Sequence, residues 1–126
     1  MNILLVDDET DTQFLFESFF RKEIKDKDYI FSFAANGKEA MSLYEKGKFD
    51  IILTDLNMPI MSGVELIKRV KSEDPDQVVV ILTAYDNKQH RDFSESFQNI
   101  NFFPKPIDFN DLKVVLSQFH ENLAQS

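Results

Sequence analysis

The chain has 126 residues, a net charge of −8 and an isoelectric point near 4.7, and 43% of its residues are hydrophobic. Because this length is typical of one domain with one core, we expect a single domain over residues 1–126 with a frayed end near residues 122–126. The acidic charge argues against binding of nucleic acid by this chain alone or of anionic membranes. The absence of cysteine excludes disulfides and thiolate metal sites.

No apolar stretch is long enough to span a membrane, and the N-terminus lacks the basic, apolar and small-residue regions of a secretory signal. We therefore expect a cytoplasmic protein without a membrane partner.

The first half of the chain contains two predicted strands, each followed by a predicted helix. The apolar run Ile3–Val6 predicts a strand buried on both faces, whereas Tyr29–Ala34 alternates imperfectly, as an edge strand would. Helical spacing of apolar residues covers 10–24 and 37–46. The expected inward side chains are Leu15, Phe16, Phe19, Phe20 and Ile24 in the first helix, and Ala40, Met41 and Tyr44 in the second.

The second half repeats this alternation three times. The predicted strands are Ile51–Thr54, Val78–Leu82 and Phe102–Pro104, and the predicted helices cover residues 62–72, 87–98 and 108–122. Ser62 stands three residues before Glu65, and Asp108 stands three before Asp111, so each can cap the helix that follows it. Five alternating strand and helix pairs predict an α/β fold with a doubly wound parallel sheet.

Polar side chains follow four of the predicted strands at the points where they end. Asp7 and Asp8 follow the first strand, Asp55 the third, Thr83 the fourth and Lys105 the fifth. Ligands bind such sheets beyond the carboxyl ends of the strands, so these groups should meet at one edge. Alone, each acidic residue or Lys105 would be interpreted as a solvated surface group, and Thr83 as a helix cap. Together they have the chemistry of a magnesium-held phosphoryl group.

Four short motifs, in order, carry a family resemblance. They are Asp7-Asp8-Glu9, Asp55-Leu56-Asn57-Met58-Pro59 with Gly63, Thr83-Ala84 and Lys105-Pro106. The chain resembles the receiver domain of two-component response regulators from about residue 2 to residue 119. The resemblance implies a flavodoxin-like (βα)5 fold with strand order 2-1-3-4-5.

The resemblance also implies the chemistry of the site. Asp55 would accept a phosphoryl group from a phosphohistidine of a histidine kinase or a histidine phosphotransfer protein. The cofactor would be Mg²⁺, with Mn²⁺ as the alternative ion. Asp8, Asp55 and the backbone carbonyl of Asn57 would be ligands, and Asp7 would hold a ligand water. The chain would therefore not be an enzyme beyond self-catalysed phosphoryl transfer and autodephosphorylation.

Further residues receive roles from the same resemblance. Thr83 and Lys105 would bind phosphoryl oxygens, and Thr83 with Phe102 would form the switch, with plain core packing as the alternative for Phe102. Asn57 and Tyr85 would tune phosphoryl hydrolysis, with simple loop chemistry as the alternative for each. The Lys105-Pro106 peptide bond would be cis.

The expected partners follow from the same family. The first helix would dock the phosphodonor, and residues 87–119 would form the output face for a partner protein or domain. The chain would be a monomer or a weak dimer. Phe93 and Phe97 replace the small residues that many receivers carry, which indicates either a repacked core or an aromatic contact surface.

Two other functions are the alternatives to this interpretation. A degenerate receiver would act as an interaction module without phosphorylation. A phosphatase of the haloacid dehalogenase type would carry a second aspartate two residues after the nucleophile, where this chain has Asn57. His90 and His120 are the two histidines, and we expect both to be solvated, so a histidine-dependent triad or zinc site lacks candidates.

Overall fold

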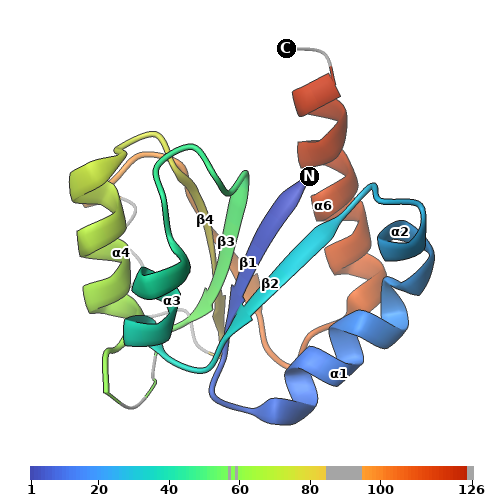
Figure 1. The fold of residues 1–126 in the computed structure, drawn as a ribbon, viewed down its shortest axis with the longest axis horizontal. Helices are drawn as coiled ribbons and strands as arrows, with labels where there is room; N and C mark the ends of the chain where they lie inside the picture. The colour runs from blue at the N-terminus through green and yellow to red at the C-terminus, as the bar shows by residue number, and fades with distance from the viewer. Residues whose placement is uncertain (57, 59, 85–94, 125–126) are drawn as a thin grey trace.

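The computed structural model describes residues 1–56, 58, 60–84 and 95–124. Its centre is a five-stranded parallel sheet in the order β2-β1-β3-β4-β5, which confirms the predicted doubly wound fold and strand order (Figure 1). The strands are β1 Asn2–Val6, β2 Ile30–Ala34, β3 Ile51–Asp55, β4 Val78–Thr83 and β5 Ile100–Pro104.

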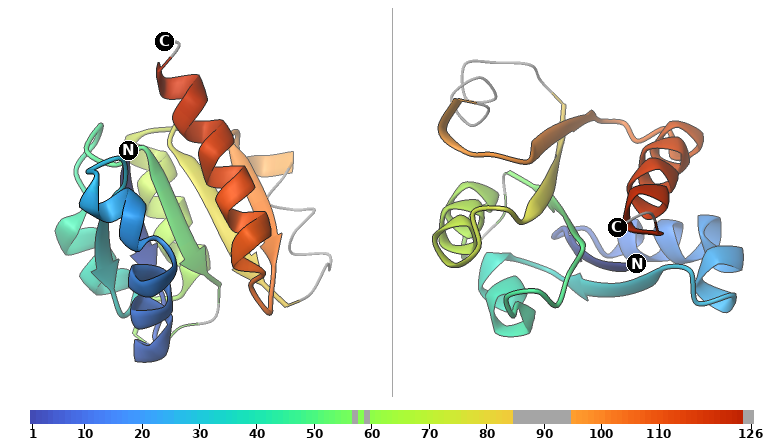
Figure 2. Two further views of the ribbon diagram at one scale, coloured as in Figure 1. Left: turned by 90° about the vertical axis from the view of Figure 1, so that its right-hand side faces the viewer. Right: turned by 90° about the horizontal axis from the view of Figure 1, so that it is seen from above.

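Helices cover both faces of this sheet. They are α1 Thr10–Phe19, α2 Arg21–Lys25, α3 Gly37–Leu43, α4 Gly63–Glu73 and α6 Phe109–Ala124. Figures 1 and 2 show α3 and α4 on one face and α1, α2 and α6 on the other. The predicted helix over 87–98 falls largely outside the described residues. Across the described ranges, no helix combines the length and the apolar character that a membrane crossing requires.

The two faces of the sheet have cores of different composition. Successive side chains of a strand point to opposite faces, so Leu4 joins a largely aliphatic cluster and Leu5 a cluster rich in aromatic rings. In the aromatic cluster, the ring centroids of Phe16 and Phe109 lie 5.1 Å apart in an edge-on contact. Burial on both faces explains why the sequences of these strands are unbroken apolar runs.

The first predicted helix differs from the expectation in its length and in the side chains that it turns toward the sheet. Residues 10–24 form two helices, because the backbone leaves the helical region at Phe20 (φ −97°, ψ 23°). Phe16 and Phe20 are fully buried, whereas Leu15 is 49% exposed and Phe19 is 37% exposed. The inward face is therefore narrower than predicted, because only one row of side chains spaced four apart reaches the sheet.

The other helix boundaries follow from caps and from one buried ring. The side chains of Ser62 and Asp108 accept hydrogen bonds from backbone N–H groups three residues later, as predicted. The helix expected to reach residue 46 ends at Leu43, because Tyr44 adopts an extended backbone and buries its ring in the aliphatic core. At the other end of the chain, α6 continues to Ala124, past the start of the expected fray.

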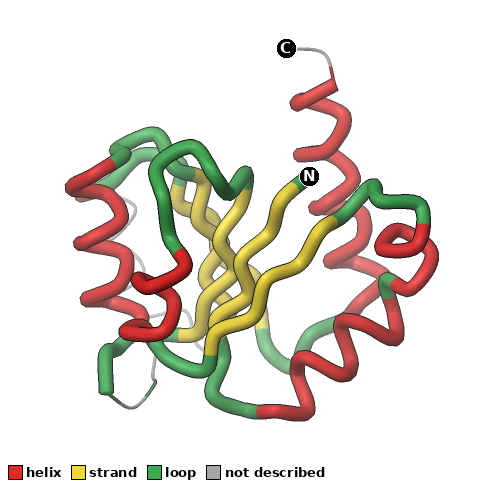
Figure 3. The backbone as a smooth tube through the Cα atoms, in the orientation of Figure 1, coloured by secondary structure: helices red, strands yellow, loops and turns green. Residues whose placement is uncertain are grey.

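A buried lysine joins α4 to the chain segments that precede β4 and β5. Figure 3 shows the backbone of these helices, strands and loops. Lys71 of α4 is 4% exposed and donates hydrogen bonds to the carbonyl groups of Pro75, Gln77 and Gln98. These carbonyls precede β4 and β5, so one ammonium group connects α4 to the starts of both strands. Burial lowers the pKa of Lys71 despite the nearby charges of Asp74 and Asp76.

Candidate functional site

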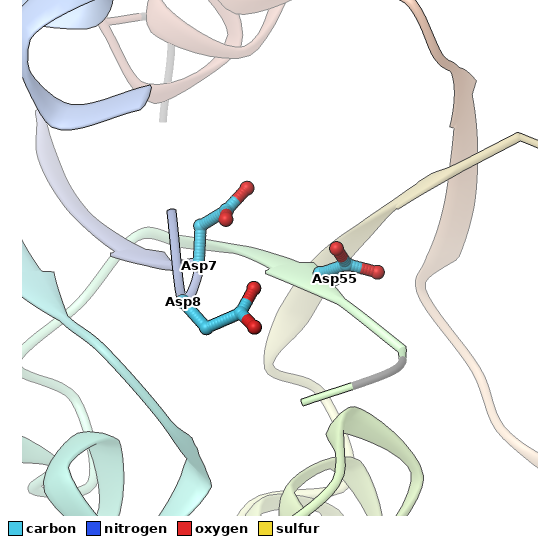
Figure 4. A group of neighbouring side chains, drawn as sticks. All are labelled: Asp7, Asp8 and Asp55. Atoms are coloured by element: carbon cyan, nitrogen blue, oxygen red, sulfur yellow. The ribbon is translucent and has the colours of Figure 1, made fainter. Parts of the chain in front are cut away.

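Three carboxylates meet at the carboxyl ends of β1 and β3. These strands are neighbours, with Val6 opposite Thr54, so Asp7 and Asp8 emerge beside Asp55. One carboxylate oxygen of each residue lies within 4.8 Å of the other two, as the close view in Figure 4 illustrates. Asp7 is only 8% exposed, whereas Asp8 is open to solvent. The site therefore combines a buried and an exposed acidic group beside the strand-end aspartate.

Lys105 supplies positive charge to this cluster from the end of β5. Its Nζ lies 2.7 Å from Asp55 Oδ2 and 3.6 Å from Asp7 Oδ2. Burial lowers the pKa of Lys105, but the hydrogen bond to Asp55 and the charges of Asp7, Asp55 and Glu9 outweigh burial and leave this pKa raised. The ammonium is thus the counterion of the acidic cluster.

Backbone contacts fix the buried carboxylate. The N–H group of Glu9 donates to Asp7 Oδ1 at 2.8 Å, and the N–H group of Asp7 itself donates to the carbonyl of Ala34 at 3.0 Å. Asp7 Oδ2 is buried and, among the described residues, has no hydrogen-bond partner. One oxygen of Asp7 is therefore held by the backbone, while the other is available to a cation or to its water.

Two glycines hold the loop that leads from Asp55 into α4. Gly63 donates to the carbonyl of Leu56 at 2.9 Å, and a Cβ atom at Gly63 would lie 2.0 Å from the carbonyl oxygen of Asp55. Gly37 of α3 donates to the carbonyl of Met61 at 3.0 Å, and a Cβ atom there would lie 2.6 Å from Met61 Cγ. Both approaches require residues without a side chain.

The same loop contains a residue in an unfavourable conformation. Ile60 has a φ of 69° and is 77% exposed. A β-branched side chain at positive φ is a steric outlier. The loop beside Asp55 therefore stores strain at a residue that contributes little to the core.

Thr83 and Lys105 lie side by side at the carboxyl ends of the neighbouring strands β4 and β5. Thr83 ends β4, and its carbonyl accepts a hydrogen bond of 2.8 Å from the N–H group of Lys105. Phe102 packs against the aliphatic core and Phe103 against the aromatic core, so the two rings lie on opposite faces. The Lys105-Pro106 bond is cis, as the resemblance implies.

Some predicted residues fall elsewhere or outside the described chain. Asn57, Tyr85, His90 and Phe93 lie outside the described residues. His120, which we expected to be solvated, is only partly exposed, and its ring packs edge-on against Tyr29 with the ring centroids 5.6 Å apart. Phe97 packs against the aliphatic core, as a repacked core requires.

Sequence reasoning missed the contact of Gly37 with the loop after Asp55. In the sequence, Gly37 marks only the start of a helix, which Asn36 caps by accepting a hydrogen bond from the N–H group of Glu39. No local pattern gives the distance from this helix to Met61.

The sequence matches one family profile over most of its length. Residues 3–117 match the profile of the response regulator receiver domain. The chain belongs to the response regulator receiver family. This receiver is 32% identical to sporulation initiation phosphotransferase F of Bacillus subtilis, and the match covers 93% of this receiver and 91% of the relative. It is also 29% identical to the transcriptional regulatory protein ZraR of Klebsiella oxytoca, of which the match covers only 28%.

Solved structures show the same fold. The receiver superposes on the response regulator TrrA of Thermotoga maritima, described in complex with Mg²⁺ and BeF, with a TM-score of 0.73, 28% identity and coverage of 94% of this chain and 97% of TrrA. The non-phosphorylated HemR receiver domain of Leptospira biflexa gives a TM-score of 0.78 and 28% identity, with 94% and 93% of the two chains covered. A role in two-component signalling follows from membership of the family.

Proposed function

We propose that this receiver accepts a phosphoryl group on Asp55 from a phosphohistidine of a histidine kinase or phosphotransfer protein, in a reaction that requires Mg²⁺. The observation that carries the proposal is the cluster of Asp7, Asp8 and Asp55, whose oxygens lie within 4.8 Å, with Lys105 bonded to Asp55. The similarity to a sporulation phosphotransferase and to a regulator described with Mg²⁺ and BeF supports it.

The donor set suits a hard cation. Carboxylate and carbonyl oxygens are the ligands that Mg²⁺ prefers, and the buried Oδ2 of Asp7 lacks a hydrogen-bond partner among the described residues. Asp8, Asp55 and the carbonyl of Asn57 would hold the ion directly, and Asp7 would hold a ligand water. Mn²⁺ is the alternative ion. Bound there, the ion would neutralise the charge that develops on the phosphoryl oxygens.

The residues of this chain would then have distinct tasks in the transfer. A carboxylate oxygen of Asp55 attacks the phosphorus, the new O–P bond forms, and the P–N bond to the donor histidine breaks. The imidazole leaves with the bonding electron pair. Lys105, with its raised pKa, stays protonated and pairs with a phosphoryl oxygen. Attack of water on the aspartyl phosphate reverses the modification, at a rate that Asn57 and Tyr85 would set.

Phosphorylation would be communicated through β4 and β5. The hydroxyl of Thr83 would move to a phosphoryl oxygen, and Phe102 would reorient within the aliphatic core against which it packs. The face formed by residues 87–119 would then bind an output partner. This single domain would act in the cytoplasm without binding nucleic acid itself.

Mass spectrometry after incubation with acetyl phosphate tests the proposal. A gain of one phosphoryl group that needs Mg²⁺ and disappears in Asp55→Asn is expected. Thr83→Ala should still be labelled but should lose the change in partner binding. Stoichiometric labelling of Asp55→Asn would place the acceptor elsewhere. Absence of labelling by acetyl phosphate and by phosphorylated kinases alike would favour a degenerate receiver that acts only as an interaction module.

A further inference from the structure

The strand β2 forms one edge of the sheet and has an unusually apolar sequence for an edge. It pairs with β1 on one side only, and Figure 1 views the molecule from this edge, with α3 on one flank and α1 and α2 on the other. Its five residues, Ile30–Ala34, are Ile-Phe-Ser-Phe-Ala and include no charge and no proline. Edge strands usually carry a charged residue or a proline, which prevents pairing with another chain.

The backbone polarity of β2 identifies the groups that face outward. Ile30 donates to the carbonyl of Met1 at 2.9 Å, and the carbonyl of Ala34 accepts from Asp7 at 3.0 Å. Because successive residues of a strand direct their N–H and C=O groups to opposite sides, those of Phe31 and Phe33 point away from β1. Among the described residues, no partner bonds these four groups.

This pattern is self-complementary about Ser32. In an antiparallel pair of two β2 strands related by a two-fold axis at Ser32, Phe31 of one copy faces Phe33 of the other. Both residues present outward N–H and C=O groups, so each pair of Phe31 and Phe33 forms two backbone hydrogen bonds. The two-fold axis creates two such pairs, and the two strands are therefore joined by four hydrogen bonds. Ser32 then faces itself as a non-hydrogen-bonded pair.

The side chains on the helical flank fit the same symmetry. Phe31 and Phe33 stack with centroids 5.9 Å apart and planes at 11°, and they line a groove of about 500 Å³ beside Ile24. Glu17 of α1 and Arg21 and Lys25 of α2 line the helical side of this groove. Because Phe31 of one copy faces Phe33 of the other, the two-fold axis places the phenylalanine rings of the second copy beside those of the first, at the strand side of this groove.

From this register we propose that the β2 edge binds a second copy of this chain, forming a ten-stranded continuous sheet through antiparallel β2 pairing centred on Ser32. The occupant is a copy rather than another protein because the outward hydrogen-bonding groups and the Phe-Ser-Phe sequence of β2 are both symmetric about Ser32 and so complement themselves. The proposal does not depend on the phosphorylation chemistry.

Disulfide cross-linking tests the register, since the natural chain contains no cysteine. A non-hydrogen-bonded antiparallel pair places its Cα atoms about 4.5 Å apart, within the range that a disulfide spans. Ser32→Cys should therefore form a covalent dimer under mild oxidation, seen on non-reducing gels. Ile30→Cys is the matched control, because Ile30 is exposed (52%) but would lie about 13 Å from its own symmetry mate.

A second pair of variants tests the association without a covalent bond. Ser32→Lys and Ser32→Glu each place like charges on the axis, so each should sediment as a monomer at concentrations where the wild type dimerises, and an equimolar mixture should recover the dimer. Cross-linking of Ile30→Cys as fast as Ser32→Cys would overturn the proposed register. A wild type that stays monomeric at millimolar concentration, with no cross-link at Ser32, would overturn the dimer.

Discussion

The Nζ atom of Lys105 donates a hydrogen bond of 2.7 Å to Oδ2 of Asp55. The expected phosphoacceptor is thus already paired with the cation that would later bind the phosphoryl group. Because Asp7 and Asp8 lie in the same cluster, this one ammonium offsets part of the repulsion among three carboxylates. A bound cation and Lys105 would therefore share the task of neutralising the site.

Removal of this counterion should destabilise the metal-free protein. We expect Lys105→Met to lower the free energy of unfolding by about 1–3 kcal/mol in chelator, because the carboxylates lose their partly buried partner. Mg²⁺ should then stabilise the variant more than it stabilises the wild type. Urea unfolding with EDTA or Mg²⁺ measures both effects. Lys113→Met, which removes a mainly exposed lysine 3.6 Å from Glu23, is the control and should change stability little.

The contribution of Lys105 should disappear at alkaline pH. Its pKa is raised in the folded state, so the folded protein binds the proton more tightly than the unfolded chain does. The stability difference between wild type and Lys105→Met should be constant below the ordinary lysine pKa, near 10.4, and should shrink as pH rises through the higher folded value. Unfolding curves recorded from pH 8 to 11 test this sign. A difference that grows over this range would contradict it.

Lys71 should show the opposite dependence on pH. Burial lowers its pKa in the folded state, so the unfolded chain binds more protons between that value and the ordinary one, and stability rises with pH there. We also expect Lys71→Met to cost about 2–4 kcal/mol at pH 7, because three carbonyl groups lose their donor. The difference from wild type should widen toward pH 10, and equal widening in Lys68→Met, an exposed neighbour, would refute the assignment.

The close contacts of Gly63 and Gly37 predict that alanine at Gly63 destabilises the loop after Asp55 more than alanine at Gly37 does. Gly63→Ala places a Cβ atom 2.0 Å from a backbone oxygen, so it should destabilise by about 3 kcal/mol or more and weaken phosphorylation. Gly37→Ala meets the side chain and backbone of Met61 at 2.6 to 2.8 Å and should cost less, since its closest contact is a side-chain carbon that can move, whereas the closest contact at Gly63 is a backbone oxygen. Melting temperature and the acetyl phosphate labelling rate give the order. Similar melting temperatures and labelling rates for the two variants would contradict this order and show that the loop can move equally well at both contacts.

Relief of strain should stabilise the receiver. Ile60→Gly removes a side chain that is 77% exposed from a φ of 69°, so we expect a gain of about 1 kcal/mol in the free energy of unfolding. Ile30→Gly serves as a control, because that exposed residue lies in a strand where glycine is unfavourable. If Ile60→Gly lost as much stability as Ile30→Gly, the contacts of the Ile60 side chain would outweigh the strain in its backbone.

The sequence predicted the parts of the site that follow from strand ends. Asp7, Asp55 and Lys105 each come directly after, or end, an apolar run, and parallel strands bring such residues together regardless of distance along the chain. The proximity of Gly37 to Met61 depends on how α3 packs, which no local pattern specifies. Apolar spacing places Leu15 in the core, although it is half exposed, because spacing alone does not tell a buried position from an exposed one beside it.

The separate hydrophobic cores on the two faces of the sheet also have a spectroscopic consequence. Tyr29 is buried among the aromatic side chains and Tyr44 among the aliphatic ones, on opposite faces. The chain has no tryptophan and three tyrosines, the third being Tyr85. A Tyr85→Phe chain would therefore carry one intrinsic fluorophore in each layer, and a further replacement of either remaining tyrosine by phenylalanine would isolate the emission of the other. This receiver thus allows the loosening of each side of its sheet to be followed separately without any external label.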